Sequence, residues 1–145
     1  DKQFRAYDMN EVARYYAASE DVAEFLAHYP ERHDFREEAG GNRVFINVWC
    51  WEPAWKIRVT ENGRELPVRR EQTEDPLYVI SYDIPQSVWK GKYPVDYGKR
   101  GKQHTLFTVD ASGPATTLEI EVTDSFGKVY RETMTRPKAF GPQMK

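Results

Sequence analysis

The sequence predicts a mainly β domain, an antiparallel sandwich of immunoglobulin or fibronectin type with about seven strands and a short N-terminal helical segment. Apolar residues recur at helical spacings of three and four only in residues 8–29. From Arg43 onward they alternate with polar residues, and turn residues follow at short intervals. Because helices at one end precede strands only, a parallel sheet is not expected. We therefore predict a helical extension over residues 1–42 that packs on a sandwich over residues 43–140, and a C-terminal tail over residues 141–145.

The helical segment divides into two short helices. Asp8 or Asn10 can cap the first helix, and Ser19 can accept from the free N–H groups of the second. Pro30 ends the second helix, because it lacks an N–H donor and disfavours helical backbone at the preceding residue. The charged stretch that continues to Gly40-Gly41 is predicted to be a linker.

The first predicted strand is apolar on both of its faces. One face carries Val44, Ile46, Val48 and Cys50, and the other carries Phe45, Trp49 and Trp51 with only Asn47 polar. We expect the first face in the sandwich core and the helical segment on the aromatic face. Cys50 is the sole cysteine, and its place between two indoles in a strand favours a small apolar core side chain.

Turn residues divide the rest of the chain into further strands. Asn62-Gly63 is typical of a type I′ hairpin turn. A second hairpin turn is predicted at Asp124-Ser125-Phe126-Gly127, with the glycine in a left-handed conformation. Residues 77–82 and 104–110 are predicted to be strands, with Leu106 and Phe107 on opposite faces.

Length and charge bound the possible functions. A chain of 145 residues fits one domain. Its 21 basic and 23 acidic residues give a net charge of −2, which does not favour nucleic acid or an anionic membrane as a partner. No apolar run reaches the roughly 18–20 residues of a membrane span, and no signal segment is recognisable.

Catalytic motifs are not found in the sequence. It has no nucleophile elbow and no phosphate-binding glycine loop. His28 and His33, with Glu24, are the one imaginable metal-ligand group, but His28 is better explained by its place at a helix C-terminus. The adjacent acids Glu37 and Glu38 are interpreted as a solvated surface. We predict no catalytic residue, no metal ligand and no cofactor in this chain.

Two stretches are candidate contact surfaces. The indoles around residues 51–55 form either an aromatic platform for a sugar or partner protein, or part of the core, which is the favoured interpretation. Basic and aromatic residues alternate over residues 86–104, which form a solvated loop, a contact with another domain of the same polypeptide, or a ligand contact. The candidate residues are Trp51, Trp55, Trp89, Lys90, Lys92, Tyr93, Tyr97, Lys99, Arg100 and Lys102.

Several segments together resemble a known family. They are the run from Phe4 to Val12, His28-Tyr29-Pro30, the stretch from Val44 to Lys56, and the stretch from Thr117 to Phe140. These segments resemble the C-terminal domain of calcineurin-like metallophosphoesterases of Bacteroidetes. The aromatic strand and the turn at residues 122–130 are the most specific parts.

The resemblance implies an accessory role. In such proteins the domain follows a catalytic core that binds two divalent metals through motifs such as Asp-x-His, Gly-Asp and Gly-Asn-His. This chain has none of them, since Gly41-Asn42 is followed by Arg43. The resemblance therefore implies a non-catalytic domain that packs on the catalytic domain of the same polypeptide, in a periplasmic or secreted protein. A glycan or cell-surface binding module using exposed tryptophans is the alternative.

Overall fold

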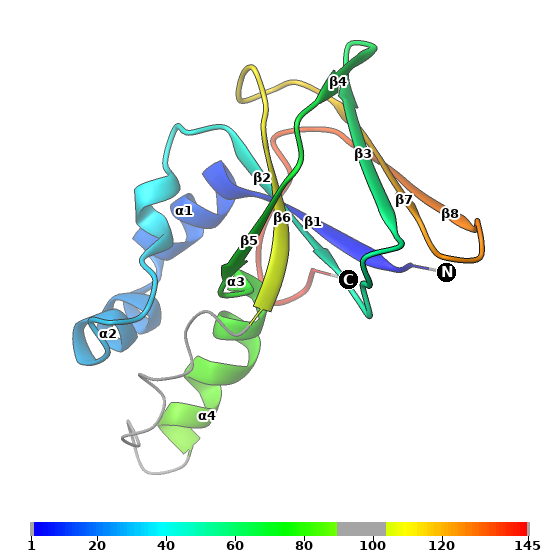
Figure 1. Ribbon diagram of the computed structural model, residues 1–145. Helices are drawn as coiled ribbons and strands as arrows, with labels where there is room; N and C mark the ends of the chain where they lie inside the picture. Colours follow the sequence, from blue (N-terminus) through cyan, green and yellow to red (C-terminus); the bar gives the residue numbers. More distant parts are fainter. Residues whose placement is uncertain (1, 90–103, 145) are drawn as a thin grey trace.

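The computed structural model describes residues 2–89 and 104–144 and arranges them in three layers, two sheets and a helical layer (Figure 1). The first sheet has the strand order β1-β2-β6-β5, and the second has the order β4-β3-β7-β8. All neighbouring strands are antiparallel. The first sheet consists of β1 (Phe4–Asp8), β2 (Arg43–Val48), β6 (His104–Asp110) and β5 (Arg69–Thr73). The second consists of β4 (Arg64–Leu66), β3 (Lys56–Glu61), β7 (Leu118–Thr123) and β8 (Val129–Met134).

The predicted mainly β antiparallel sandwich is confirmed. If the strands are lettered A, B, C, C′, D, E, F and G along the chain, the sheets read A-B-E-D and C′-C-F-G. This is the strand order of immunoglobulin sandwiches with one additional strand beside C. Eight strands are found in the described residues, against about seven expected.

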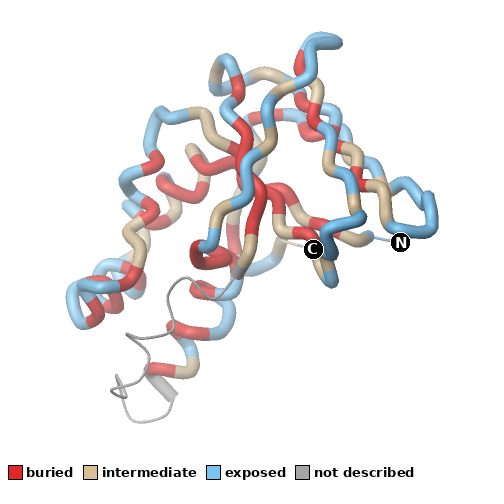
Figure 2. Tube along the Cα trace, viewed as in Figure 1, coloured by how far each residue is buried: buried red, intermediate tan, exposed pale blue. Residues whose placement is uncertain are grey.

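The core between the sheets follows from the period-two alternation of the strands. Val44 and Ile46 of β2 point inward and lie in one buried cluster with Ile120 and Val122 of β7. Leu106 and Phe107 of β6 belong to different clusters, as predicted from their neighbouring positions. Along β7, buried residues alternate with exposed or half-buried ones (Figure 2).

A helical layer covers the other face of the first sheet (Figure 1). It contains α1 (Met9–Ala18), α2 (Glu20–His28) and the short 3-10 helix η1 (Phe35–Glu38). The predicted caps are confirmed, because Asp8 accepts from the Asn10 N–H and Ser19 accepts from the Val22 N–H. Phe45 of β2 packs into this layer, so the aromatic face of the strand is covered by helices as expected.

The predicted strand at residues 77–82 is wrong, because this segment is helical. It comprises α3 (Pro76–Tyr78), the π-helix η2 (Val79–Asp83) and α4 (Ile84–Trp89). The Asp75 carboxylate caps the start by accepting from the Leu77 N–H, and Pro76 suits the first helical turn. Leu77, Ile80 and Ile84 are buried in the helical layer, at spacings of three and four.

Residues 1–42 hold a strand as well as helices. β1 was not predicted, yet Phe4 and Ala6 belong to the core between the sheets. β1 is an edge strand, and the C-terminal segment lies beside it. There Lys138 donates through Nζ to the Ala6 carbonyl, and Arg136 lies buried 3.4 Å from the Asp8 carboxylate.

Cys50 is not the core residue that the sequence analysis predicted. β2 ends at Val48, and Cys50 is exposed in a turn with a φ of 55°. This turn reverses the alternation, so Trp51 packs against the core between the sheets and not on the helical face. Trp49 remains half-buried, with the Arg5 guanidinium 5.5 Å from its ring.

Truncation of the buried Ile120 tests the core between the sheets. We expect Ile120→Ala to lower the free energy of unfolding by about 2–5 kcal/mol, because it removes buried methyl groups and leaves a cavity. Urea unfolding followed by tryptophan fluorescence measures the change. Ile57→Ala on the neighbouring strand is the control, and its half-buried side chain predicts a smaller loss.

Glu61 makes stability depend on pH. Burial raises the pKa of this carboxyl, but hydrogen bonds from Thr116 and Ser112 outweigh burial and hold it below its ordinary value near 4.5. The stabilisation is therefore present above that value and is lost as the pH falls through the folded-state pKa. We expect Glu61→Gln to destabilise the domain at pH 7, with a difference that shrinks below about pH 4.

Unfolding curves between pH 3 and pH 7 measure this difference for Glu61→Gln. The exposed Glu37→Gln is the control and should show little difference at any pH. A Glu61→Gln effect of equal size at pH 3 and pH 7 contradicts the assignment.

Candidate functional site

A buried charged cluster joins the helical layer to the segment after β5. Arg32 donates through Nε to Glu74 and through a terminal nitrogen to Asp83, each at 2.6 Å. All three side chains are 3% exposed or less. Burial lowers the pKa of Arg32, but the two carboxylates outweigh burial and raise it, so the guanidinium stays charged.

A third buried carboxylate, that of Asp75, follows Glu74 in the chain. Asp75 accepts from the Tyr7 hydroxyl at 2.7 Å and from the Asn47 side chain. Burial raises the pKa of Tyr7, and the Asp75 charge raises it further. Burial likewise raises the pKa of Tyr16, as does the charge of Glu74. Both phenols therefore remain neutral, and Tyr7 is fixed as a hydrogen-bond donor to Asp75.

These carboxylates are engaged in contacts within the fold. General acid–base catalysis needs a titratable group within reach of a substrate. Here Glu74 and Asp83 are engaged by Arg32, and Asp75 by Tyr7 and the start of α3. In the part of the chain that the structure describes, no group of three or more His, Cys, Asp or Glu side chains is arranged to hold a metal ion.

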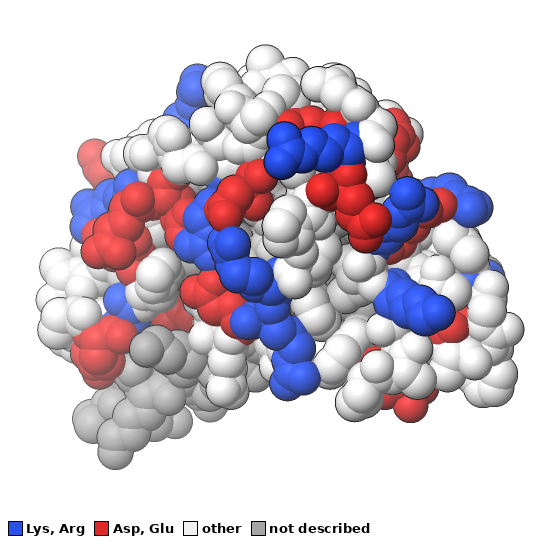
Figure 3. Space-filling model, turned by 45° about the horizontal axis from the view of Figure 1, so that its top comes forward, with Lys and Arg blue, Asp and Glu red and all other residues white. Residues whose placement is uncertain are grey.

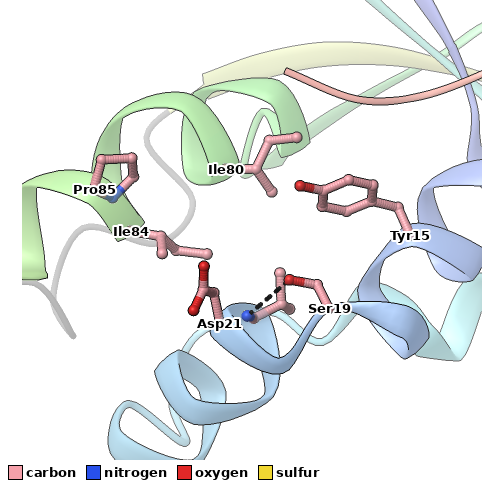
Figure 4. A pocket seen from close by; sticks show the side chains of 7 residues that line it. Tyr15, Ser19, Asp21, Ile80, Ile84 and Pro85 are labelled. Atoms are coloured by element: carbon pink, nitrogen blue, oxygen red, sulfur yellow. Dashed lines mark hydrogen bonds between the residues drawn. The ribbon is translucent and has the colours of Figure 1, made fainter. Parts of the chain in front are cut away.

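An apolar pocket lies between α1, α2 and the helices that follow β5 (Figure 4). Its volume is about 470 Å³. Tyr15 and Ile80 point into it from opposite sides, and Asp21 is the acidic side chain at its rim (Figure 4). The lining offers the Asp21 carboxylate and the hydroxyls of Tyr15 and Ser19, and the Ser19 hydroxyl already caps α2. The pocket can bury apolar groups, but it offers no set of catalytic groups.

Basic side chains on the face shown in Figure 3 form a narrow band across its centre, with acidic side chains beside it. Arg43 contacts Glu38 and Glu71, and Arg69 contacts Asp110 at 2.7 Å. Because these arginines are neutralised by neighbours, they do not create a single-sign field for an anionic ligand.

Trp51 and Trp55 lie at one end of the sandwich and are both half-buried. The Trp51 ring meets Phe107 edge to face at 5.2 Å, and the Arg70 guanidinium lies 4.7 Å from its centroid. Trp55 donates through Nε1 to Glu52 at 3.2 Å. Each indole thus contacts a different partner, and neither is fully exposed.

The structure adds a residue to this end that the sequence analysis did not single out. Phe126 at the tip of the β7–β8 hairpin is 94% exposed. Ser125 beside it donates to the same Glu52 oxygen that accepts from Trp55. The sequence offered one signal for the exposure of Phe126, which is its position at the tip of a predicted turn. Such a tip faces solvent.

The other candidate contact residues are not brought to this end by any described contact. Trp89 is the last residue of α4. The remaining candidates lie outside the described residues: Lys90, Lys92, Tyr93, Tyr97, Lys99, Arg100 and Lys102. The hypothesis of a basic and aromatic contact surface therefore stays a prediction.

Fold and site define a β-sandwich domain with a helical layer, in which the described buried charges serve packing. The chain belongs to the family described as C terminal of calcineurin-like phosphoesterase, whose model matches residues 1–130. No curated protein and no solved structure matches it. None of the helices in residues 2–89 and 104–144 is long and apolar enough to cross a membrane.

Arg32 is the residue whose removal tests the packing role of the charged cluster. We expect Arg32→Ala to lower the free energy of unfolding by about 3–5 kcal/mol, because it leaves the Glu74 and Asp83 carboxylates buried without a counter-charge. Arg36→Ala removes an exposed pair with Asp34 and is the matched control, with little effect expected. Chemical unfolding at pH 7 measures both, and equal losses contradict the role given to the cluster.

Proposed function

We propose that this chain is a non-catalytic accessory domain of a calcineurin-like metallophosphoesterase, which packs on the catalytic domain of the same polypeptide and orients it. The family match over residues 1–130 carries the proposal, because the family comprises the C-terminal part of these enzymes and not their catalytic core. The two divalent metals belong to that core. By the same resemblance, the parent enzyme is of the type found in Bacteroidetes and acts in the periplasm or outside the cell.

The chemistry of the described residues supports a non-catalytic role. The ligand motifs of the catalytic core do not occur in the sequence, which has only three histidines. The buried carboxylates are each paired within the fold, as in the ion pairs of Arg32 with Glu74 and Asp83. Carboxylates that are neutralised inside the fold in this way are not available as ligands of a metal with an open coordination position.

The glycan-binding alternative finds no support at Trp51 and Trp55. Sugar-binding platforms present exposed aromatic faces. Trp51 and Trp55 are half-buried, and the Trp51 ring is occupied by Phe107 and Arg70. We therefore do not retain the glycan hypothesis as a second candidate function.

Deletion of the domain from the intact phosphoesterase tests the proposal. We expect this chain alone to be inert toward phosphomonoesters and phosphodiesters in the presence of Mn²⁺ or Zn²⁺, since it lacks the metal ligands. The parent without residues 1–145 should show lower or redirected hydrolysis, because its catalytic domain loses a packing partner.

The control is the intact parent carrying Arg36→Ala, an exposed substitution that leaves this domain folded. Hydrolysis by the isolated chain would overturn the proposal. So would a deletion that leaves both the activity and the thermal stability of the catalytic domain unchanged.

A further inference from the structure

We infer that one end of the sandwich is the surface on which the catalytic part of the phosphoesterase docks, with the Phe126 ring inserted into an apolar recess of that part. We call this surface the docking end. It consists of Gln3, the β2–β3 connection at residues 49–55, and the β7–β8 turn at residues 124–128. The inference rests on the proposed function and gives the contact a place.

Phe126 differs from the other large apolar side chains on the described surface. It is 94% exposed, whereas Tyr82 reaches 40%, Tyr78 38% and Val129 37%. A single exposed apolar residue is common on proteins, so exposure alone does not define a contact. The backbone that holds the ring and the residues beside it distinguish Phe126 from such a residue.

The turn presents the Phe126 ring on a fixed backbone. Asp124 accepts through one carboxylate oxygen from the Phe126 N–H at 2.9 Å and from the Lys128 N–H at 3.0 Å. Gly127 has a φ of 83°, and its N–H donates to the Asp124 carbonyl. A preorganised turn loses little conformational entropy on binding. Most of the favourable free energy of burying the Phe126 ring is therefore retained.

The turn is also joined to the β2–β3 connection. Glu52 accepts from Ser125 at 3.0 Å and from the Trp55 indole at 3.2 Å. Phe126 therefore belongs to one surface with the two half-buried indoles. An exposed aromatic anchor beside aromatic and polar neighbours is the composition of an interface centre with its rim.

The position of β1 identifies the occupant. Gln3 exchanges hydrogen bonds with Trp49, through Trp49 N–H to the Gln3 carbonyl at 3.0 Å and Gln3 Nε2 to the Trp49 carbonyl at 2.8 Å. Gln3 and Phe4 line a pocket together with Tyr130 and Arg131, so this start of the chain lies beside the β8 strand that follows the β7–β8 turn (Figure 1). In a family that forms the C-terminal part of the enzyme, the catalytic part joins before β1 and so leaves from the docking end. The tether gives it a high effective concentration there.

The opposite end of the sandwich offers no comparable anchor among the described residues. It carries the Asn62-Gly63 turn and the loop after β6, where Glu61 binds Ser112 and Thr116. The exposed large apolar side chains of the structure do not lie in these segments. The polar character of the opposite end and the attachment of the catalytic part before β1 therefore both favour the docking end.

A photo-crosslinker tests the contact in the intact phosphoesterase. Benzoylphenylalanine is placed at position 126, and in a separate protein at position 82, an exposed tyrosine of the helical layer. We expect irradiation to join position 126 to a peptide of the catalytic part within one polypeptide, and position 82 to give no such product. A product between two copies, or none from position 126, overturns the inference.

Hydrogen exchange in the same intact protein gives a second measurement. Phe126→Ser removes the anchor at a site where the fold does not need it, and Tyr82→Ser is the control. We expect Phe126→Ser to speed exchange of residues 49–55 by roughly tenfold, as for loss of an interface hot spot, and Tyr82→Ser to leave it unchanged. Equal exchange in both variants overturns the inference.

The two hypotheses fail in different ways. If position 126 gives no product while deletion of the domain still alters hydrolysis, the accessory function stands and the docking end is wrong. If deletion changes neither activity nor stability while position 126 maps to the catalytic part, the contact exists and the accessory function is wrong.

Discussion

Both faces of the first sheet must be buried, and the rest of the structure depends on this constraint. β2 is apolar on both faces, so each face needs a cover that excludes water. Val44 and Ile46 are covered by the second sheet, and Phe45 is covered by the helical layer. The helices are therefore an integral layer, without which the aromatic face of β2 would be exposed to solvent.

The helical layer is held in register by polar groups as well as by apolar packing. Arg32 follows α2, while Glu74 and Asp83 flank the start of the helices after β5. Apolar contacts are non-directional, whereas these ion pairs and the Tyr7–Asp75 hydrogen bond have fixed geometry. Together they fix the helical layer on the first sheet.

Local chemistry predicted much of the fold, and tertiary context decided the rest. Caps at Asp8 and Ser19 and the left-handed Asn62 and Gly127 depend on neighbouring residues alone, so the sequence reveals them. The strand predicted at residues 77–82 is wrong because a short apolar run fits the spacing of a strand as well as that of a helix. The Asp75 cap favours the helix that is observed.

The docking end was less predictable from the sequence than the fold. The turn at Cys50 reversed the alternation, so Trp51 could not be placed from its position in the strand pattern. Phe126 was visible in the sequence only as part of a turn, since its link to Glu52 through Ser125 spans 73 positions. Contacts of that separation depend on the assembled sandwich and leave no local pattern.

The C-terminal segment beside β1 has a consequence for self-association. An edge strand is a template for a strand from another molecule. Here Lys138 donates to the Ala6 carbonyl and Phe140 packs against Tyr7, so part of that template is already covered from within the chain. These residues lie beyond the family match, which ends at residue 130. A protein that ends at residue 130 would lack this covering segment. The unpaired edge of β1 would then be open to strand pairing with other copies of the protein.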